Sequence, residues 1–299
     1  MKKINYLKNL GLVSLILLLS VTLSFAGGNK GSDKCKTKYP IVLAHGMGAQ
    51  FEIAWGITHY WNNIPKELKN EGATVYITSV NSMDGTENKA KAFRKQVLEI
   101  LAISGASKVN IIGHSHGSVY SRYAITNLDG LTNRVASHTS IAGPHRGSVI
   151  AELVLGLIDD NILEDVANGF FGLIMNDTNS DTKQNLEDLT RSFMIDVFNP
   201  NTPNINGIYY QSYAYRIKNV IGAGMFLPTW PIQKKYEGEN DGLVAVESAK
   251  WGKFRGVITG GLFGVNHLSA VDMLFGMTPG FDAPAHYVGM VGELKGMGY

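Results

Sequence analysis

The sequence predicts an α/β fold with a mostly parallel central sheet and helices on both faces of that sheet. Short apolar segments rich in β-branched residues recur along the chain, as is typical of buried strands. Between them lie longer segments whose apolar side chains recur at helical spacing. Strands that alternate with helices in this way form parallel sheets whose two faces are both covered.

The alternation is clearest in the first half of the chain. The expected strands are 39–44, 74–78, 108–112 and 135–142. The expected helices are 57–68, 87–103 and 118–128, and the second has the strongest amphipathic pattern. No internal repeat and no long linker interrupts the sequence, so residues 27–299 are predicted to be a single domain.

The first 26 residues are expected to be a secretory signal peptide. Lys2, Lys3 and Lys8 precede an apolar run, 10–23, which ends at the small-x-small sequence 24–26. The run is too short for a membrane-spanning helix and no stop-transfer pattern follows it. We therefore expect an extracellular protein that crosses the periplasm in transit.

Composition excludes several classes of protein. The chain is 44% hydrophobic and 17% charged, which is typical of a folded domain and not of a disordered chain. Three of the 27 basic residues lie in the expected signal peptide, so the mature chain would have 24 basic and 25 acidic residues. This balance argues against nucleic-acid binding. The single cysteine, Cys35, excludes an intrachain disulfide; it is expected to be a stray thiol near the start of the mature chain, with intermolecular pairing as the alternative.

One pentapeptide points to nucleophilic catalysis. Gly113-His114-Ser115-His116-Gly117 is the only G-x-S-x-G in the chain and lies between an expected strand and an expected helix. A turn this sharp strains its apex residue, and side chains two positions before and after it would collide. Glycine at both positions predicts a nucleophile elbow with the Ser115 hydroxyl exposed at its apex.

A serine hydroxyl needs a histidine base, and that base needs an acid to hold its tautomer. His267 is the favoured base because it follows the glycine-rich segment 260–264, which can bring an imidazole to the edge of the sheet. His286 is the main alternative, whereas His138 is expected in the core and His145 near the site without acting as base.

For the acid, Asp241 is the best candidate because it lies in an Asn-Asp-Gly turn beside an apolar segment. Glu239 is the alternative, and Asp272 lies too close to His267 along the chain to face its ring. The oxyanion of a tetrahedral intermediate would be bound by two backbone N–H groups. We assign them to His116, directly after the nucleophile, and to Met47, in the loop after the first strand.

Several motifs together resemble one family. The segments 39–47, 104–117, 144–148, 240–244 and 266–268 look like those of the true lipases of the Pseudomonas–Burkholderia–Proteus type, in the same order along the chain. The resemblance implies an α/β-hydrolase fold that lacks the first two strands of its sheet and carries a helical lid, here expected within 148–182. It also implies hydrolysis of acylglycerol esters at a lipid–water interface by Ser115, Asp241 and His267. We expect a monomer; a foldase chaperone assists some members, and the sequence leaves that requirement open.

The chain also departs from this family. Family members usually bind calcium through two aspartates, one of them two residues after the catalytic histidine. That position is Ser269 here, and no aspartate lies between Asp196 and Asp241 to supply the second carboxylate. A neutral hydroxyl is a poor substitute for a carboxylate on a hard dication. We therefore expect no metal and no other cofactor.

Other functions remain open on the same chemistry. A short-chain esterase, a phospholipase or a polyester hydrolase would use the same three residues, because the substrate is chosen by pocket residues that the sequence does not place. A catalytically silent binding protein is a remote alternative, since silent relatives lose members of the triad and none is missing here.

Overall fold

Six strands form one sheet in the order β2-β1-β3-β4-β5-β6, and every pairing is parallel. The computed structural model describes residues 32–47, 60–158, 181–273 and 278–299. The strands are β1 (Ile41–Ala44), β2 (Val75–Ile77), β3 (Val109–His114), β4 (Val135–Ile141), β5 (Tyr209–Tyr215) and β6 (Lys253–Ile258). The predicted signal peptide lies outside the described residues, and so does the part of the expected lid from 159 to 180.

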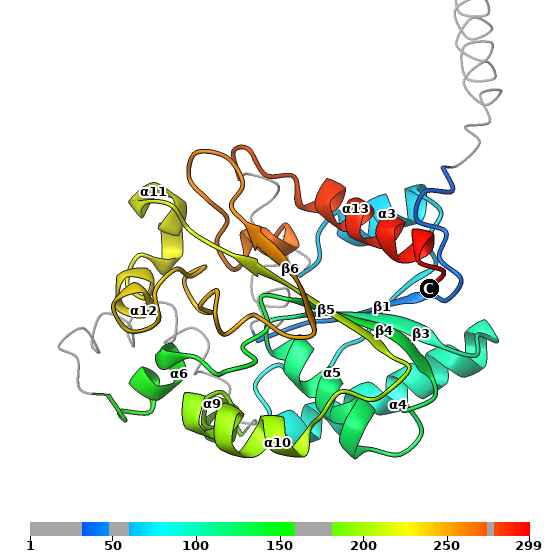
Figure 1. Ribbon diagram of the computed structural model, residues 1–299, viewed down its shortest axis with the longest axis horizontal. Coiled ribbons are helices and arrows are strands. Elements are labelled where there is room, and N and C mark those ends of the chain that lie inside the picture. Colours follow the sequence, from blue (N-terminus) through cyan, green and yellow to red (C-terminus); the bar gives the residue numbers. More distant parts are fainter. Residues whose placement is uncertain (1–31, 48–59, 159–180, 274–277) are drawn as a thin grey trace, which may run out of the picture. The chain divides into compact units, whose positions relative to one another are not determined.

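Helices cover both faces of this sheet, so the predicted α/β class is confirmed. Figure 1 shows α3 (Ile64–Asn70) and α13 (Ala283–Gly296) on one face, and α4 (Thr86–Ser104) and α5 (His116–Asn127) on the other. Most of the remaining helical segments are short: α6 (Val149–Val154), α9 (Thr182–Glu187), the π-helix η2 (Phe193–Phe198), α10 (Asn199–Asn201), α11 (Val220–Ala223), η3 (Gly224–Phe226), α12 (Trp230–Glu237) and η4 (Ser269–Val271).

The alternation of side chains along β1 explains why the sheet has a core on each side. Ile41 and Leu43 pack into one hydrophobic cluster with α3 and α13, whereas Val42 and Ala44 pack into a second cluster with α4 and α5. All four side chains are fully buried. This double burial fits the unbroken apolar sequence of the strand.

Element boundaries differ from the predicted ones where turn chemistry decides them. The helix expected over 57–68 begins only at Ile64, with Pro65 in its first turn. β3 extends two residues further than expected, and α5 begins two residues earlier, so that a single residue separates them. The elements β5, β6, α12 and α13 were not among the predicted ones.

Cys35 belongs to the core and is not a stray thiol. Its side chain is fully buried and its Sγ lies 3.4 Å from the Val288 carbonyl oxygen, to which it donates. Burial raises the pKa of the thiol to about 11. A buried, protonated thiol is unsuited to intermolecular pairing.

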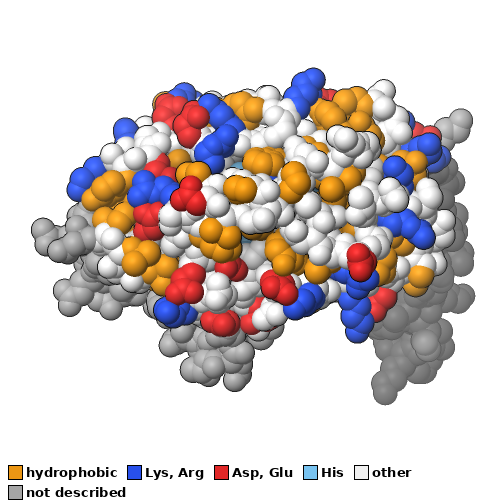
Figure 2. All heavy atoms as spheres, turned by 60° about the horizontal axis from the view of Figure 1, so that its bottom comes forward, with side chains coloured by type: hydrophobic (Ala, Val, Ile, Leu, Met, Phe, Trp, Pro, Cys, Tyr) orange, Lys and Arg blue, Asp and Glu red, His pale blue; other side chains and the backbone are white. Residues whose placement is uncertain are grey.

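The surface carries charges of both signs. On the face seen in Figure 2, basic, acidic and apolar side chains are interspersed, and no large field of one sign dominates. Within the described residues, no helix is both long enough and apolar enough to cross a membrane.

Candidate active site

Ser115 occupies the sharp turn between β3 and α5. Its backbone has φ 56° and ψ −131°, a strained conformation for a residue with a side chain. A Cβ at Gly113 would lie 2.7 Å from backbone atoms of Ser118, and one at Gly117 would lie 2.1 Å from the Ala44 carbonyl oxygen. The two glycines are therefore required for the turn, as expected for a nucleophile elbow.

The loop after β1 lies directly against Ser115. A Cβ at Gly46 would lie 2.6 Å from the Ser115 Cβ, so only glycine allows this approach. Two tyrosines fix the loop: the Tyr120 hydroxyl donates to the His45 carbonyl oxygen (2.8 Å), and the Tyr60 hydroxyl accepts from the Gly46 N–H (2.7 Å). The loop thus brings the next residue, Met47, into the pocket that contains Ser115.

The ring of His45 gives the same loop a third fixed point. Its Nε2 accepts from the Val80 N–H (3.0 Å), so its proton is on Nδ1, which donates to the Gly46 carbonyl oxygen (2.9 Å). Burial lowers the pKa of His45 to about 4. The ring therefore stays neutral at neutral pH.

Asp241 and His267 form a buried pair. The His267 Nδ1 donates to Asp241 Oδ2 (2.7 Å), and the His267 backbone N–H donates to the Asp241 carbonyl oxygen (2.9 Å). The other carboxylate oxygen accepts from the N–H groups of Leu243 (3.0 Å) and Val244 (2.8 Å). With both oxygens engaged, the carboxylate is held in place and fixes the orientation of the ring, whose Nε2 is the nitrogen turned away from Asp241.

Two rings pack near the His267 imidazole, and the amide of the preceding residue holds the turn that carries it. The centroid of the His114 ring lies 4.6 Å from that of His267, and Phe226 meets it edge-on at 6.4 Å. The neighbouring Asn266 accepts from the Ser269 N–H (2.9 Å) and hydroxyl (3.0 Å) through Oδ1, and donates to the Gly222 carbonyl oxygen through Nδ2 (3.1 Å).

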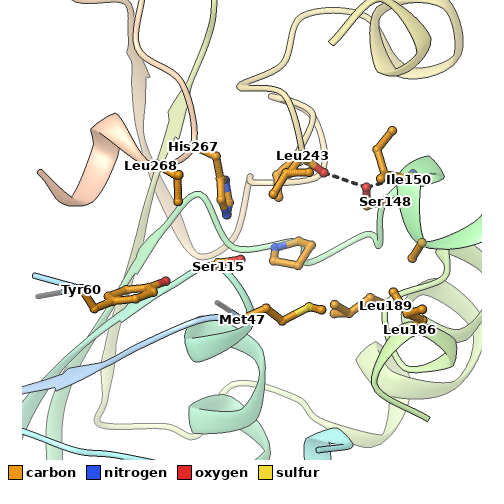
Figure 3. A pocket seen from close by; sticks show the side chains of 13 residues that line it. Met47, Tyr60, Ser115, Ser148, Ile150, Leu186, Leu189, Leu243, His267 and Leu268 are labelled. Atoms are coloured by element: carbon orange, nitrogen blue, oxygen red, sulfur yellow. Dashed lines mark hydrogen bonds between the residues drawn. The ribbon is translucent and has the colours of Figure 1, made fainter. Parts of the chain in front are cut away.

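An apolar pocket opens over these residues. In Figure 3 the His267 imidazole points toward Ser115, with Met47 and Tyr60 on the opposite wall. The far end is formed by α6 and by the end of α9, through apolar side chains that include Ile150, Leu186 and Leu189. Ser148, just before α6, is tied to this pocket because its hydroxyl donates to the Leu243 carbonyl oxygen (2.7 Å).

The alternative bases lie elsewhere. His286 is on α13, where its Nε2 is 3.0 Å from the Tyr215 hydroxyl. His138 is fully buried in β4 against the Ser121 hydroxyl (2.8 Å). His145 is buried between Ser140 and Arg122, although its neighbour Pro144 lines the pocket.

The alternative acids have other partners. Glu239 is largely exposed and pairs with Arg216. Asp272 accepts hydrogen bonds from Asn62 Nδ2 (3.0 Å) and the Asn63 N–H (3.3 Å). Neither carboxylate is bonded to His267, so only Asp241 is placed to orient that ring.

The contacts of Tyr60 were not predicted from the sequence. Besides holding Gly46, its hydroxyl lies within hydrogen-bonding distance (2.5 Å) of His114 Nδ1. Tyr60 therefore joins the loop after β1 to the residue before Ser115. The contact joins two segments that lie far apart in the sequence, so no local sequence pattern predicts it.

Comparisons with known proteins identify relatives of this chain. A triacylglycerol lipase of Vibrio cholerae is 33% identical over 266 residues, which cover 81% of this chain and 82% of that protein. The family model for palmitoyl protein thioesterase matches residues 40–181, which include Ser115 but neither Asp241 nor His267.

Solved structures resemble the fold. A metagenomic carboxyl esterase superposes with a TM-score of 0.67 at 17% identity, over 87% of this chain and 76% of that one. The mature lipase of Bacillus licheniformis superposes with a TM-score of 0.62 at 18% identity, over 88% of this chain and 94% of that one.

Proposed function

The chain belongs to the bacterial triacylglycerol lipases, a family of serine hydrolases, and from this membership we propose that it hydrolyses carboxylic esters of acylglycerols through an acyl-enzyme at Ser115. The observation that carries the proposal is the Asp241–His267 hydrogen bond of 2.7 Å beside a pocket that also contains a serine at a strained elbow. The role of each residue follows from this arrangement.

In the first half-reaction, the Ser115 Oγ attacks the ester carbonyl carbon while His267 Nε2 takes the hydroxyl proton. Asp241 holds the ring in the tautomer that can accept this proton and stabilises the imidazolium. The N–H groups of Met47 and His116 donate to the oxyanion. When the intermediate collapses, the alkoxide leaves with the proton from His267.

In the second half-reaction, water replaces the alcohol. His267 takes a proton from the water as it attacks the acyl carbonyl, and returns it to Ser115 Oγ as the fatty acid leaves. The apolar pocket wall formed by Ile150, Leu186 and Leu189 suits the acyl chain.

Initial rates on p-nitrophenyl esters of increasing acyl length test the proposal. The Ser115→Ala variant should lose activity by at least ~10³-fold at every chain length, since the Ser115 hydroxyl is the proposed nucleophile of the acyl-enzyme. Ser118→Ala is the control, because that hydroxyl is buried and donates to the Gly113 carbonyl oxygen. Activity retained by Ser115→Ala would contradict the proposal. The wild-type length profile separates a lipase from a short-chain esterase.

We further propose that the segment 148–182 is a cover over the pocket. Its described part supports this, because the α6 side chains Ile150 and Ala151 line the pocket. The helix expected in this segment is only partly present in its described part: Leu153 is buried, but α6 ends at Val154 and Leu157 is exposed. Removing the segment should lower the preference for emulsified over soluble esters; an unchanged ratio would count against a cover.

The residues present do not fit the calcium site of the family. The Ser269 hydroxyl is engaged with Asn266 Oδ1 (3.0 Å), and in the parts of the chain that the structure describes no three His, Cys, Asp or Glu side chains converge as metal ligands. We propose that the Asn266 amide, bonded to Ser269 and Gly222, holds the turn that carries His267. Activity and melting temperature should then be the same in chelator and in excess calcium; a loss in chelator would overturn this.

Export is proposed from the sequence pattern alone. The exported protein should begin at Gly27, which intact-mass measurement of the culture medium would establish. A mass that includes residues 1–26 would contradict the proposed cleavage.

A further inference from the structure

A lysine lies completely buried next to the proposed oxyanion site. Lys89, in the first turns of α4, is 1% exposed. Lysines are almost never fully buried without a partner. Its Nζ lies 2.9 Å from His116 Nδ1, and within the described residues no carboxylate forms an ion pair with it. The hydrogen-bond partner of this amino group is thus the imidazole of the residue that follows Ser115, and burial lowers the pKa of Lys89 well below its usual value although Asp84 and Asp188 oppose the shift.

The contact determines the state of the His116 ring. We assign the Lys89 amino group as the donor to Nδ1, which places the ring proton on Nε2, where it is donated to the Thr86 hydroxyl (2.8 Å). Burial and the nearby charge of Lys89 keep the pKa of His116 well below its usual value. The ring is therefore neutral and held at both of its nitrogens.

The same contacts reach the wall of the pocket. The Thr86 N–H donates to Asp188 Oδ2 (2.6 Å), and the Gln184 side chain donates to Asp188 Oδ1 (2.8 Å). Asp188 is the C-cap residue of α9, between Leu186 and Leu189 of the pocket. We name these contacts the Lys89 network, which consists of Lys89, His116, Thr86 and Asp188. The network connects α4, α5 and α9, and Figure 1 shows α4 and α5 side by side.

We propose that Lys89 is a positioning residue for the oxyanion hole: its amino group, bonded to the His116 imidazole, tethers this residue to α4 and so holds the His116 backbone N–H where the oxyanion forms. The inference rests on the proposed function. His116 is the first residue of α5, directly after the strained Ser115, so side-chain contacts that tether His116 to α4 also restrain the backbone that carries its N–H. A donor must lie within about 2.7–3.1 Å of the oxyanion to stabilise it.

The first test compares two lysines of the same helix. Lys89→Met keeps the apolar length of the side chain and leaves His116 Nδ1 without its donor. We expect kcat on a soluble p-nitrophenyl ester to fall about 10-fold or more with KM nearly unchanged, because the lost interaction acts on the transition state. Lys91→Met is the matched control, since Lys91 is exposed and pairs only with Glu87. A folded Lys89→Met with wild-type kcat would overturn the proposal.

Thr86 provides a second test, which does not depend on the folding of the lysine variant. Thr86→Val removes the hydroxyl that binds the other ring nitrogen, whereas Thr86→Ser keeps it. We expect kcat to fall several-fold in Thr86→Val and to stay near the wild-type value in Thr86→Ser. Equal kcat values for both variants would contradict a role for the His116 ring.

A boronic acid that adds to Ser115 distinguishes positioning from general loosening of the fold. Its tetrahedral adduct places an oxygen in the oxyanion site, so its affinity for Lys89→Met should fall by about the same factor as kcat. A lower kcat with unchanged inhibitor affinity would place the defect elsewhere and overturn the proposal. The proposed function fails separately, if Ser115→Ala remains active.

Discussion

At the residue scale, Asp241 and Glu239 differ in surroundings although they are two positions apart. Asp241 is fully buried and bonded to His267, whereas Glu239 is exposed and paired with Arg216. Asp241→Asn should lower kcat by about 10³–10⁴-fold, because an amide in place of Oδ2 can favour the wrong imidazole tautomer. Glu239→Gln should stay within a few-fold of the wild type. Initial rates on a soluble ester test both, and the reverse result would assign the acid to Glu239.

Single residues were predictable where their chemistry needs a local backbone feature. Ser115 was found because a strained turn requires glycines at Gly113 and Gly117, and Asp241 because it precedes Gly242, whose φ is 102°. Lys89 was not found, because what makes it unusual is burial against His116, 27 positions away. A sequence pattern can place a lysine on a helix, but it does not show which face of that helix is covered by other elements of the fold.

At the element scale, Arg122 anchors α5 to the segments that surround the site. Its guanidinium donates to His145 Nδ1 (2.9 Å), Asn199 Oδ1 (3.2 Å) and the Thr202 carbonyl oxygen (2.9 Å), and stacks on Trp251 with Cζ 3.4 Å from the ring centroid. Burial lowers its pKa to about 9, which still leaves it charged at neutral pH.

Replacing this guanidinium should therefore cost stability. Arg122→Met leaves three acceptors without this donor, two of them buried, and we expect the free energy of unfolding to fall by about 2–4 kcal/mol. Arg94→Met, on exposed α4 surface, should change it by less than about 0.5 kcal/mol. Chemical denaturation of both variants measures the difference. Equal midpoints would mean that the stacked aromatic rings alone hold α5 in place.

Elements were predictable in the half of the chain with regular alternation. β1 and α4 lie within one or two residues of their expected bounds, because apolar runs and helical periodicity define them. β5 was not predicted because its sequence combines tyrosines with Gln211, Ser212 and Ala214. The burial of these side chains depends on the neighbouring strands β4 and β6. α13 was not predicted because Gly289, Gly292 and Gly296 interrupt it, and glycine has little helical propensity.

At the scale of the whole molecule, the fold buries many neutral histidines. Burial lowers the pKa of His45 and His286 to about 4 and that of His138 to about 3, and it lowers the pKa values of His114, His116 and His145 well below the usual range. All six rings are free to take up protons near pH 6.5 once the chain unfolds. Unfolding is therefore coupled to proton uptake.

The sign of this coupling predicts acid lability. A histidine whose pKa is lower in the folded state contributes stability above its unfolded pKa, and this contribution is lost as the pH falls from about 6.5 toward the folded value. Each such ring steepens the decline by up to about 1.4 kcal/mol per pH unit. Denaturation at pH 7.5, 6.5 and 5.5 should show a free energy of unfolding that falls steeply below pH 6.5. His286→Gln removes one partly buried ring, so it should reduce the number of protons taken up on unfolding by up to one and reduce the slope of the free energy against pH accordingly. A free energy of unfolding that does not depend on pH over this range would mean that these rings are charged in the folded protein.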